Sequence, residues 1–414
     1  MRSDTVAVRA GREDCERLGV HAPPLDLSTT YPIRDLEAGG LSLDAMVGGG
    51  RPTGSAVYAR LHNPTVARFE EALARLEAGD DAVAFASGMA AMTAAVLAAG
   101  VEGRRHVVAV RPLYGGTDHL LESGLLGSEV SWTDAAGVGR AIRDDTGLVV
   151  IETPANPTLT LIDIAAVVRE AGEVPVLVDS TFATPVLQRP LECGATMVLH
   201  SATKFLGGHG DVMGGVVATM GDWAGRLRQV RMVTGAVLHP LAGYLLHRGL
   251  TTLPVRVRAQ QAAAGKLARW LNRHPAVHQV YYPGLPGGDP EALIGRQMVG
   301  PGSLIAFRVT GGLEAARRVM AGVRIIVPAV SLGSVDSLIQ HPAGMTHRIV
   351  DAEARESSGV SDDLLRLSVG LEAWEDLRED LARALAAAGV ARPAGVDKGW
   401  WTAKGPERER ARVS

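Results

Sequence analysis

The sequence predicts an α/β fold in which helices cover both faces of a mostly parallel sheet. The main observation is that short apolar runs alternate with stretches of helical periodicity between residues 82 and 199, a pattern typical of strands that are buried on both sides. A second observation is that polar residues and glycines follow most of these runs. Because ligands lie beyond the carboxyl ends of the strands in such sheets, we expect these residues to meet at one edge.

Residues 1–56 are predicted to form an extended N-terminal arm. They mix proline, glycine and polar residues without a sustained period, and they include Gly48-Gly49-Gly50. Such an arm often wraps a partner subunit, so we expect it to lie between subunits.

The first clear helix is predicted to begin at Asn63-Pro64. Asn63 can cap the helix, Pro64 suits its first position, and apolar residues recur at helical spacing until Gly79 ends it. A buried strand is predicted at residues 82–85. Further apolar runs and helical stretches follow at residues 89–97, 107–110, 148–151, 162–168, 176–178 and 197–199.

The rest of the chain indicates a second, smaller domain. A long amphipathic stretch over residues 240–271 leads into hairpin-like pieces at 277–282, 303–309 and 325–330. The predicted division is therefore a large domain at 57–250 and a smaller C-terminal α+β domain at 251–397. Residues 398–414 are rich in Arg and Glu towards their end and are predicted to be a flexible tail.

Composition excludes several classes of function. The formal net charge of −3 in 414 residues argues against a nucleic-acid binder and favours a small-molecule substrate. The two cysteines, Cys15 and Cys193, lie far apart and indicate neither a disulfide framework nor a metal site. No signal-like segment and no run of about 18 apolar residues occurs, so we expect a cytoplasmic protein that does not contact membranes.

The run His200-Ser201-Ala202-Thr203-Lys204 carries the most informative chemistry. The amine of Lys204 can form a Schiff base with an aldehyde, and the hydroxyls of Ser201 and Thr203 can donate hydrogen bonds to a phosphate. Asp179, which ends an earlier apolar run, can keep a pyridine nitrogen protonated. Together these groups suit pyridoxal phosphate (PLP). The alternative for Lys204 is an ordinary solvated lysine on a loop.

Two further motifs support this interpretation. Ser87-Gly88-Met89 follows a predicted strand and opens a helix, so its backbone N–H groups and the positive helix end can bind a phosphate. Tyr114 follows the strand at 107–110, where its ring can stack on a planar cofactor and exchange protons. The alternatives are an ordinary turn and a tyrosine anchored in a loop.

From about Tyr58 to Leu381 the chain resembles the Cys/Met-metabolism PLP enzymes, which include cystathionine γ-synthase, cystathionine γ-lyase, O-acylhomoserine sulfhydrylases and methionine γ-lyase. The resemblance implies the PLP-dependent aminotransferase-like fold (fold type I) with a mostly parallel seven-stranded sheet. The matching motifs include Tyr58-Ala59-Arg60, Asn63-Pro64-Thr65, Ser87-Gly88-Met89, Leu113-Tyr114-Gly115, Ile151-Glu152-Thr153-Pro154, Asn156-Pro157-Thr158, Asp179, His200-Ser201-Ala202-Thr203-Lys204, Arg248-Gly249-Leu250 and Leu365-Arg366-Leu367.

The resemblance also implies roles for individual residues. Lys204 would hold PLP covalently and act in catalysis together with Tyr114, which would stack on the cofactor, while Asp179 would pair with the ring nitrogen. The resemblance further implies a homotetramer built from two dimers whose active sites are shared. The remaining implied contacts to PLP are Gly88, Met89, Thr181, Ser201 and Thr203 of one subunit with Tyr58 and Arg60 of its neighbour, and those to the substrate are Arg366, Asn156 and Ser331.

The expected reaction is α,γ-elimination on methionine or a homocysteine-like amino acid, which gives a 2-oxo acid, ammonia and a thiol or sulfide. Relatives that handle cystathionine tend to carry acidic residues at the positions of Val57 and Val330, where apolar side chains would leave a distal amino group unpaired. Gly116 departs from the cysteine that methionine γ-lyases usually carry. Two alternatives remain open: γ-replacement of the cystathionine γ-synthase or O-acylhomoserine sulfhydrylase type, and cystathionine γ-lyase activity.

Two rival readings belong to other classes of protein. One is a non-catalytic homologue that binds PLP as a regulator or scaffold. The other is a metal enzyme that uses His341 and His347, although their spacing does not place both on one helical face. We expect no metal site.

Overall fold

The computed structural model describes residues 1–348 and 359–389. The predicted tail at 398–414 and the last residues of the predicted C-terminal domain, 390–397, lie outside the described residues. Two sheets organise the described part of the chain, one of seven strands and one of five.

The seven-stranded sheet has the order β1-β7-β6-β5-β4-β2-β3. Strands β6, β5, β4, β2 and β3 run parallel, while β7 is antiparallel to both of its neighbours. The prediction of a mostly parallel sheet is thus confirmed. The strands are β1 (Asp81–Phe85), β2 (His106–Val110), β3 (Glu129–Thr133), β4 (Thr146–Glu152), β5 (Val176–Asp179), β6 (Met197–His200) and β7 (Gly215–Thr219).

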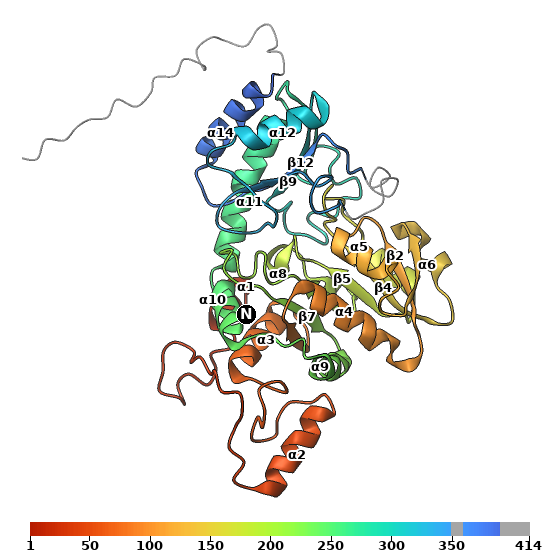
Figure 1. Ribbon diagram of the computed structural model, residues 1–414, viewed down its shortest axis with the longest axis vertical. Coiled ribbons are helices and arrows are strands. Elements are labelled where there is room, and N and C mark those ends of the chain that lie inside the picture. The colour runs from red at the N-terminus through yellow and green to blue at the C-terminus, as the bar shows by residue number, and fades with distance from the viewer. Residues whose placement is uncertain (349–358, 390–414) are drawn as a thin grey trace, which may run out of the picture.

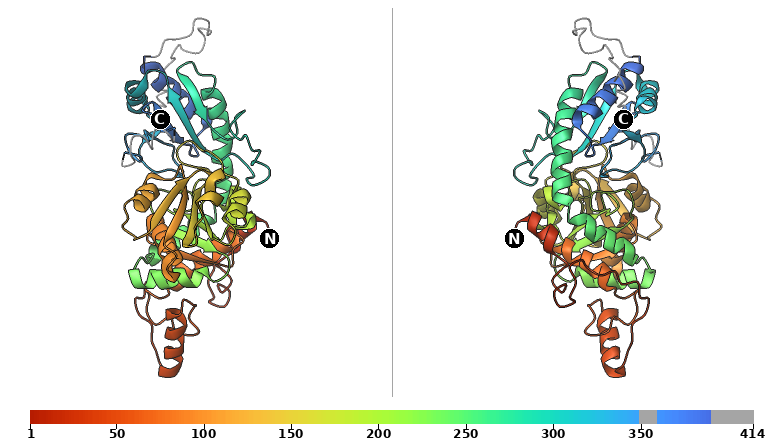
Figure 2. Two further views of the ribbon diagram at one scale, coloured as in Figure 1. Left: turned by 90° about the vertical axis from the view of Figure 1, so that its right-hand side faces the viewer. Right: turned by 90° about the vertical axis from the view of Figure 1, so that its left-hand side faces the viewer.

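Helices cover both faces of this sheet (Figures 1 and 2). Successive residues of a strand point to opposite faces, and in β1 Val83 and Phe85 pack into one core while Ala82 and Ala84 pack into another. This explains why the strands appear in the sequence as continuous apolar runs. The helices are α3 (Pro64–Leu76), α4 (Gly88–Ala99), α5 (Gly115–Glu122), α6 (Val138–Ala141), α7 (Ile164–Ala171), α8 (Thr184–Leu187), α9 (Trp223–Thr234) and α10 (Pro240–Leu250).

The predicted start of the first clear helix is confirmed in detail. Asn63 caps α3, because its side-chain oxygen accepts hydrogen bonds from the N–H groups of Thr65 and Val66 at 3.0 and 3.2 Å. Pro64 follows at the first helical position, where its missing N–H costs nothing. The helix ends at Leu76, three residues before Gly79.

The N-terminal arm is less extended than predicted, because it contains α1 (Ser3–Arg9) and α2 (Leu36–Val47). The carboxylate of Asp35 caps α2 by accepting hydrogen bonds from two backbone N–H groups. Sequence reasoning missed this helix because Gly39 and Gly40, both poor helix formers, interrupt its pattern. Figures 1 and 2 show α2 at one end of the molecule, apart from the sheets.

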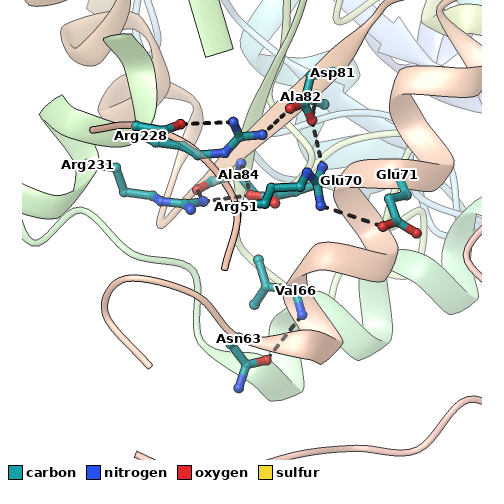
Figure 3. Close-up of polar contacts among 11 residues, drawn as sticks. Arg51, Asn63, Val66, Glu70, Glu71, Asp81, Ala82, Ala84, Arg228 and Arg231 are labelled. Atoms are coloured by element: carbon teal, nitrogen blue, oxygen red, sulfur yellow. Dashed lines mark hydrogen bonds and ion pairs between the residues drawn. The ribbon is translucent and has the colours of Figure 1, made fainter. Parts of the chain in front are cut away.

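A network of charged side chains fastens the end of the arm to the body (Figure 3). Arg51 of the arm pairs with Asp81 of β1 at 2.6 Å. Arg228 of α9 also pairs with Asp81 and donates a hydrogen bond to the carbonyl oxygen of Gly49 at 3.1 Å. Because the arm is held at these points, the segment that follows it starts from a fixed position.

The five-stranded sheet has the order β10-β11-β12-β9-β8. One sequence expectation was wrong here: of the hairpin-like piece at 325–330, only Val327–Pro328 pairs, and it pairs in parallel with β11. The strands are β8 (Val277–Tyr281), β9 (Leu304–Val309), β10 (Val327–Pro328), β11 (Leu338–Gln340) and β12 (Leu364–Ser368), and the helices are α11 (Leu253–Leu271), α12 (Gly312–Gly322) and α14 (Trp374–Ala387).

Helix α11 joins the two parts of the chain. Its first turns, with Leu253 and Val257, pack into a core of the large sheet, and its later turns, with Ala264 and Leu267, pack into the core of the small one. The domain boundary predicted after residue 250 falls just before this helix and stays a prediction. Within the described ranges, no helix combines the length and the apolar character that crossing a bilayer requires.

Candidate active site

A pocket of about 670 Å³ opens at the carboxyl ends of the large sheet's strands, next to β12 and the loop before β11. All of the predicted site residues except Tyr58 and Arg60 line it. Those that follow strands of the large sheet meet at its edge as expected, and Ser331 and Arg366 join them from the part of the chain that holds the small sheet. The predicted residues in its wall are Gly88, Met89, Tyr114, Asn156, Asp179, Thr181, Ser201, Thr203, Lys204, Ser331 and Arg366.

Lys204 lies in the loop after β6 and lines the pocket. The Nζ atom donates a hydrogen bond to the Oγ atom of Ser331 at 2.8 Å. Burial, together with the nearby positive charge of Arg366, lowers the pKa of Lys204 to about 8. The neutral amine, which is the nucleophilic form, is therefore far more populated near neutral pH than in a solvated lysine.

Asp179 ends β5 and presents a partly buried carboxylate to the same pocket. Its Oδ1 atom accepts hydrogen bonds from the N–H and the hydroxyl of Thr181, at 3.0 and 2.6 Å. Burial raises the pKa of Asp179, and the two bonds from Thr181 oppose that rise. Since no salt bridge to it occurs among residues 1–348 and 359–389, a protonated ring nitrogen is a fitting partner for this acid.

The N-terminus of α4 forms the side of the pocket that suits a phosphate. Ser87 caps the helix through Ala90, and the N–H groups of Gly88 and Met89 in the first turn have no acceptor within the helix. A Cβ atom on Gly88 would lie 2.9 Å from the Cβ atom of Ser201, so glycine is needed for the two loops to approach. These N–H groups suit the phosphate of PLP, while Lys204 suits its aldehyde and Asp179 its ring nitrogen.

The hydroxyl of Thr203 already has partners in the backbone, and its predicted contact with the phosphate stays a prediction. This hydroxyl donates a hydrogen bond to the carbonyl oxygen of Gly214 at 3.2 Å and accepts one from the N–H of the same residue at 3.1 Å. Thr203 lines the pocket, but its proton is already used by the backbone. It can donate to a phosphate only by giving up the first of these bonds.

Arg366 lies in β12, where it is buried and lines the pocket. Its guanidinium donates to the Oδ1 atom of Asn156 at 2.7 Å and to the carbonyl oxygen of Ser331 at 2.9 Å. Burial lowers the pKa of Arg366 to about 10, so the group stays cationic at neutral pH. Among residues 1–348 and 359–389 no salt bridge to Arg366 occurs, although the charge of Glu152 partly offsets the fall in its pKa, so the guanidinium suits the carboxylate of an amino acid.

Tyr114 stands at the start of α5 with its ring in the pocket wall and 40% of its surface exposed. A Cβ atom on Gly116 would lie only 2.6 Å from the Cε1 atom of that ring and 3.3 Å from the sulfur of Met89. The Tyr114 ring can therefore occupy its observed position only because residue 116 has no side chain.

We expect Gly116→Ala to displace the ring of Tyr114 and to lower the turnover rate about tenfold, because the catalytic role predicted for this ring depends on its alignment. The matched control is Gly40→Ala in α2, where no atom lies within 4 Å of the added Cβ. Steady-state kinetics of both variants would test this, and unchanged kinetics for Gly116→Ala would show that the ring has another place to lie.

Sequence reasoning did not assign a role to Glu152, although it ends β4 as Asp179 ends β5. The structure places Glu152 in the pocket wall, where it accepts hydrogen bonds from the N–H groups of Tyr114 and Asn156. An acid directly after an apolar run was the available signal. Apolar side chains form much of the remaining wall, namely Met92, Phe182, Leu199, Met213, Val330, Leu332 and Met345.

Tyr58 and Arg60 lie on the segment after the arm and do not line this pocket. Arg60 donates a hydrogen bond to the carbonyl oxygen of Met232 at 2.7 Å, and its guanidinium lies 5.5 Å from the centre of the Tyr58 ring. Tyr58 is 45% exposed. Their predicted contact with the phosphate of a neighbouring subunit stays a prediction.

The histidine pair considered as a metal site has other contacts. A ring nitrogen of His341 lies 2.7 Å from the carbonyl oxygen of Asp362. In the parts of the chain that the structure describes, no three His, Cys, Asp or Glu side chains are grouped so that they could hold a metal ion.

Comparison with known proteins agrees with this geometry. L-methionine gamma-lyase of Brevibacterium sandarakinum is 58% identical over 393 residues, covering 94% of this chain and 99% of that protein. L-methionine gamma-lyase of Streptomyces avermitilis is 60% identical over 383 residues, covering 92% of this chain and 88% of that protein.

Solved structures resemble the chain along almost its whole length. Cystathionine gamma synthase from Xanthomonas oryzae pv. oryzae, crystallised with aminoacrylate and cysteine, superposes with a TM-score of 0.86 at 37% identity and covers 94% of this chain and 98% of its own. Cystathionine gamma lyase from Micromonospora echinospora gives a TM-score of 0.84 at 41% identity, covering 93% of this chain and 99% of its own. The sequence model described as "Cys/Met metabolism PLP-dependent enzyme" matches residues 4–386. With the lysine, the acid and the phosphate-binding helix end in one pocket, the chain belongs to the family of Cys/Met metabolism PLP-dependent enzymes.

Proposed function

We propose that the protein is a PLP-dependent carbon–sulfur lyase that converts methionine, by α,γ-elimination, to 2-oxobutanoate, ammonia and methanethiol. The observation that carries this proposal is a single pocket in which Lys204, Asp179 and Arg366 face a wall that is mostly apolar. The similarity to proteins named L-methionine gamma-lyase, at 57–60% identity, supports the same choice.

PLP, when bound, supplies an electron sink that stabilises negative charge on the carbons of the substrate. Lys204 would hold the cofactor aldehyde and would afterwards, as a free amine, remove the proton from Cα and move a proton at Cβ. Asp179 would keep the ring nitrogen protonated. Arg366, steadied by Asn156 and Ser331, would bind the α-carboxylate of the substrate in two hydrogen bonds.

Tyr114 is the proposed proton donor to the sulfur atom as the Cγ–S bond breaks. Its ring borders the pocket and its backbone is fixed by Glu152. Protonation turns the departing sulfur into neutral methanethiol, and water then releases 2-oxobutanoate and ammonia, which balances the reaction.

The apolar wall favours the methyl group of methionine over the charged end of cystathionine. Val330, Met213 and Met345 line the pocket, and the two acids in its wall already accept hydrogen bonds, Glu152 from two backbone N–H groups and Asp179 from Thr181. A distal ammonium group would face apolar side chains and the cation of Arg348. Burying it without a partner costs several kcal/mol.

The decisive assay offers the PLP-loaded protein methionine, homocysteine, cystathionine, and O-acetylhomoserine with a thiol. We expect methionine to give equal amounts of 2-oxobutanoate and methanethiol at the highest kcat/KM of the panel. Thioether formation from O-acetylhomoserine and the thiol, or a clear preference for cystathionine, would contradict the proposal.

The pKa of Lys204 predicts how the PLP-free protein captures its cofactor. Only the neutral amine attacks an aldehyde, so the capture rate should rise with pH through about 8 and level off above it, instead of rising towards the usual lysine value of about 10.4. Absorbance changes on mixing with PLP at a series of pH values measure this rate. A rate that keeps rising beyond about pH 10 would contradict the assigned environment of Lys204.

We also infer a homotetramer of two dimers, in which Tyr58 and Arg60 of one subunit contact the cofactor phosphate of its neighbour. Tyr58 and Arg60 do not line their own chain's pocket, and Tyr58 is exposed, which supports this arrangement. A cytoplasmic location is our further inference, supported by the free thiols of Cys15 and Cys193.

A further inference from the structure

Glu152 is a buried carboxylate that the proposed cofactor and substrate contacts leave without a function. It is 4% exposed, and its backbone pairs with that of Asp179 in the sheet, so two acids end neighbouring strands. Burial, and secondly the charge of Asp179, raise the pKa of Glu152 well above its usual range. A second acid beside Asp179 is costly to keep, which indicates that its oxygens are needed.

Both oxygens of Glu152 bind the backbone of pocket residues. The Oε2 atom accepts a hydrogen bond from the N–H of Tyr114 at 2.6 Å, and the Oε1 atom accepts one from the N–H of Asn156 at 2.8 Å. These two residues lie in different loops, after β2 and after β4. The carboxylate therefore sets the distance between the two loops.

The chain of contacts continues to the small sheet. The side-chain oxygen of Asn156 accepts a hydrogen bond from the Nη1 atom of Arg366 at 2.7 Å. Glu152 thus connects the backbone of Tyr114, at the start of α5, with Arg366 on β12 through Asn156. No other single side chain in the described residues bonds to both loops.

We propose that Glu152 is a positioning residue that fixes Tyr114 and Arg366 relative to each other. The inference rests on the proposed function for what these two groups do, while the hydrogen bonds themselves do not depend on it. A carboxyl group has an acceptor on each oxygen, whereas glutamine has one acceptor and one NH₂ donor. Glutamine at residue 152 would therefore keep the hydrogen bond to one loop and lose the hydrogen bond to the other.

The test compares Glu152→Gln with the parent enzyme, both loaded with PLP. L-Norleucine serves as the probe, because it has the chain length of methionine and an α-carboxylate but no leaving group. Absorbance titration gives its Kd, and visible circular dichroism of the bound PLP reports on the neighbouring Tyr114 ring. We expect unchanged PLP content, an altered dichroism and a Kd raised about tenfold, the size of effect that one lost buried hydrogen bond produces.

Asp380→Asn is the matched control for the loss of a buried acid. The Asp380 carboxylate accepts hydrogen bonds from the N–H groups of Arg324, Ile325 and Ile326 at 2.8–3.1 Å, next to the small sheet and outside the pocket. This variant should lower Tm while the norleucine Kd and the dichroism stay at the parent values. An equal shift in Asp380→Asn would overturn the proposal, because the effect would then be one of general stability.

Parent-like Kd and dichroism in Glu152→Gln would also overturn it. Glu152→Asp is the second variant, since it keeps the carboxylate but shortens its reach. If neither Glu152 variant folds, the residue is part of the folding core and the positioning role is wrong. Methionine turnover by the parent enzyme tests the proposed function separately, because norleucine binding requires no elimination.

Discussion

Lys204→Ala is expected to abolish methionine turnover, lowering kcat by about 10⁴-fold or more. The variant loses both the amine that holds the cofactor aldehyde and the base that moves protons at Cα and Cβ. Its fold should be intact, because among the described residues the one side-chain bond lost is that from Nζ to the Oγ atom of Ser331 at 2.8 Å. Removing a partly buried amine also removes the cost of burying it. Product formation and Tm, measured on the same preparation, check both statements.

Lys266→Ala is the control for this prediction. Lys266 lies in α11, its amine is 5.1 Å from the centre of the Trp374 ring, and it does not line the pocket. It should keep parent kinetics. Turnover by Lys204→Ala within tenfold of the parent would mean that another group performs these steps.

Arg366→Ala is expected to raise KM for methionine about 100-fold or more, with a smaller effect on kcat. Truncating one partner of a buried charged hydrogen-bonded pair costs about 2–5 kcal/mol, which corresponds to this range. The variant also leaves the side-chain oxygen of Asn156 and the carbonyl oxygen of Ser331 without their donor, so a lower Tm should accompany the change.

Arg308→Ala is the matched control, because Arg308 lies on the neighbouring strand β9 and pairs with Asp363 outside the pocket. It should leave KM unchanged. An Arg366→Ala enzyme with parent KM would remove the assignment of this guanidinium to the substrate carboxylate, whatever its Tm.

Short-range signals in the sequence predicted much of the fold. Asn63 defines the start of α3 through hydrogen bonds to backbone N–H groups at most three residues away, and Pro64 suits the first helical position. Ser87 caps the start of α4 in the same way. The ends of buried strands were equally informative, since Asp179 and Lys204 meet in the pocket as expected. Parallel strands with both faces buried leave a continuous apolar run that a sequence displays directly.

Features that depend on distant contacts were missed. The antiparallel placement of β7 between β1 and β6 depends on pairing across the chain, and nothing local indicates its direction. The bonds of Glu152 to two loops and of Thr203 to Gly214 required coordinates, because each joins residues that the sequence separates. Helix α2 was hidden for a different reason, the glycines within it.

The most direct test of the account is to load the purified protein with PLP, reduce it with borohydride, digest it and locate the modified peptide by mass spectrometry. The account predicts one pyridoxyl group per chain, on the peptide that contains Lys204, and none in Lys204→Ala. Modification at another lysine, or no stable incorporation at saturating PLP, would contradict it.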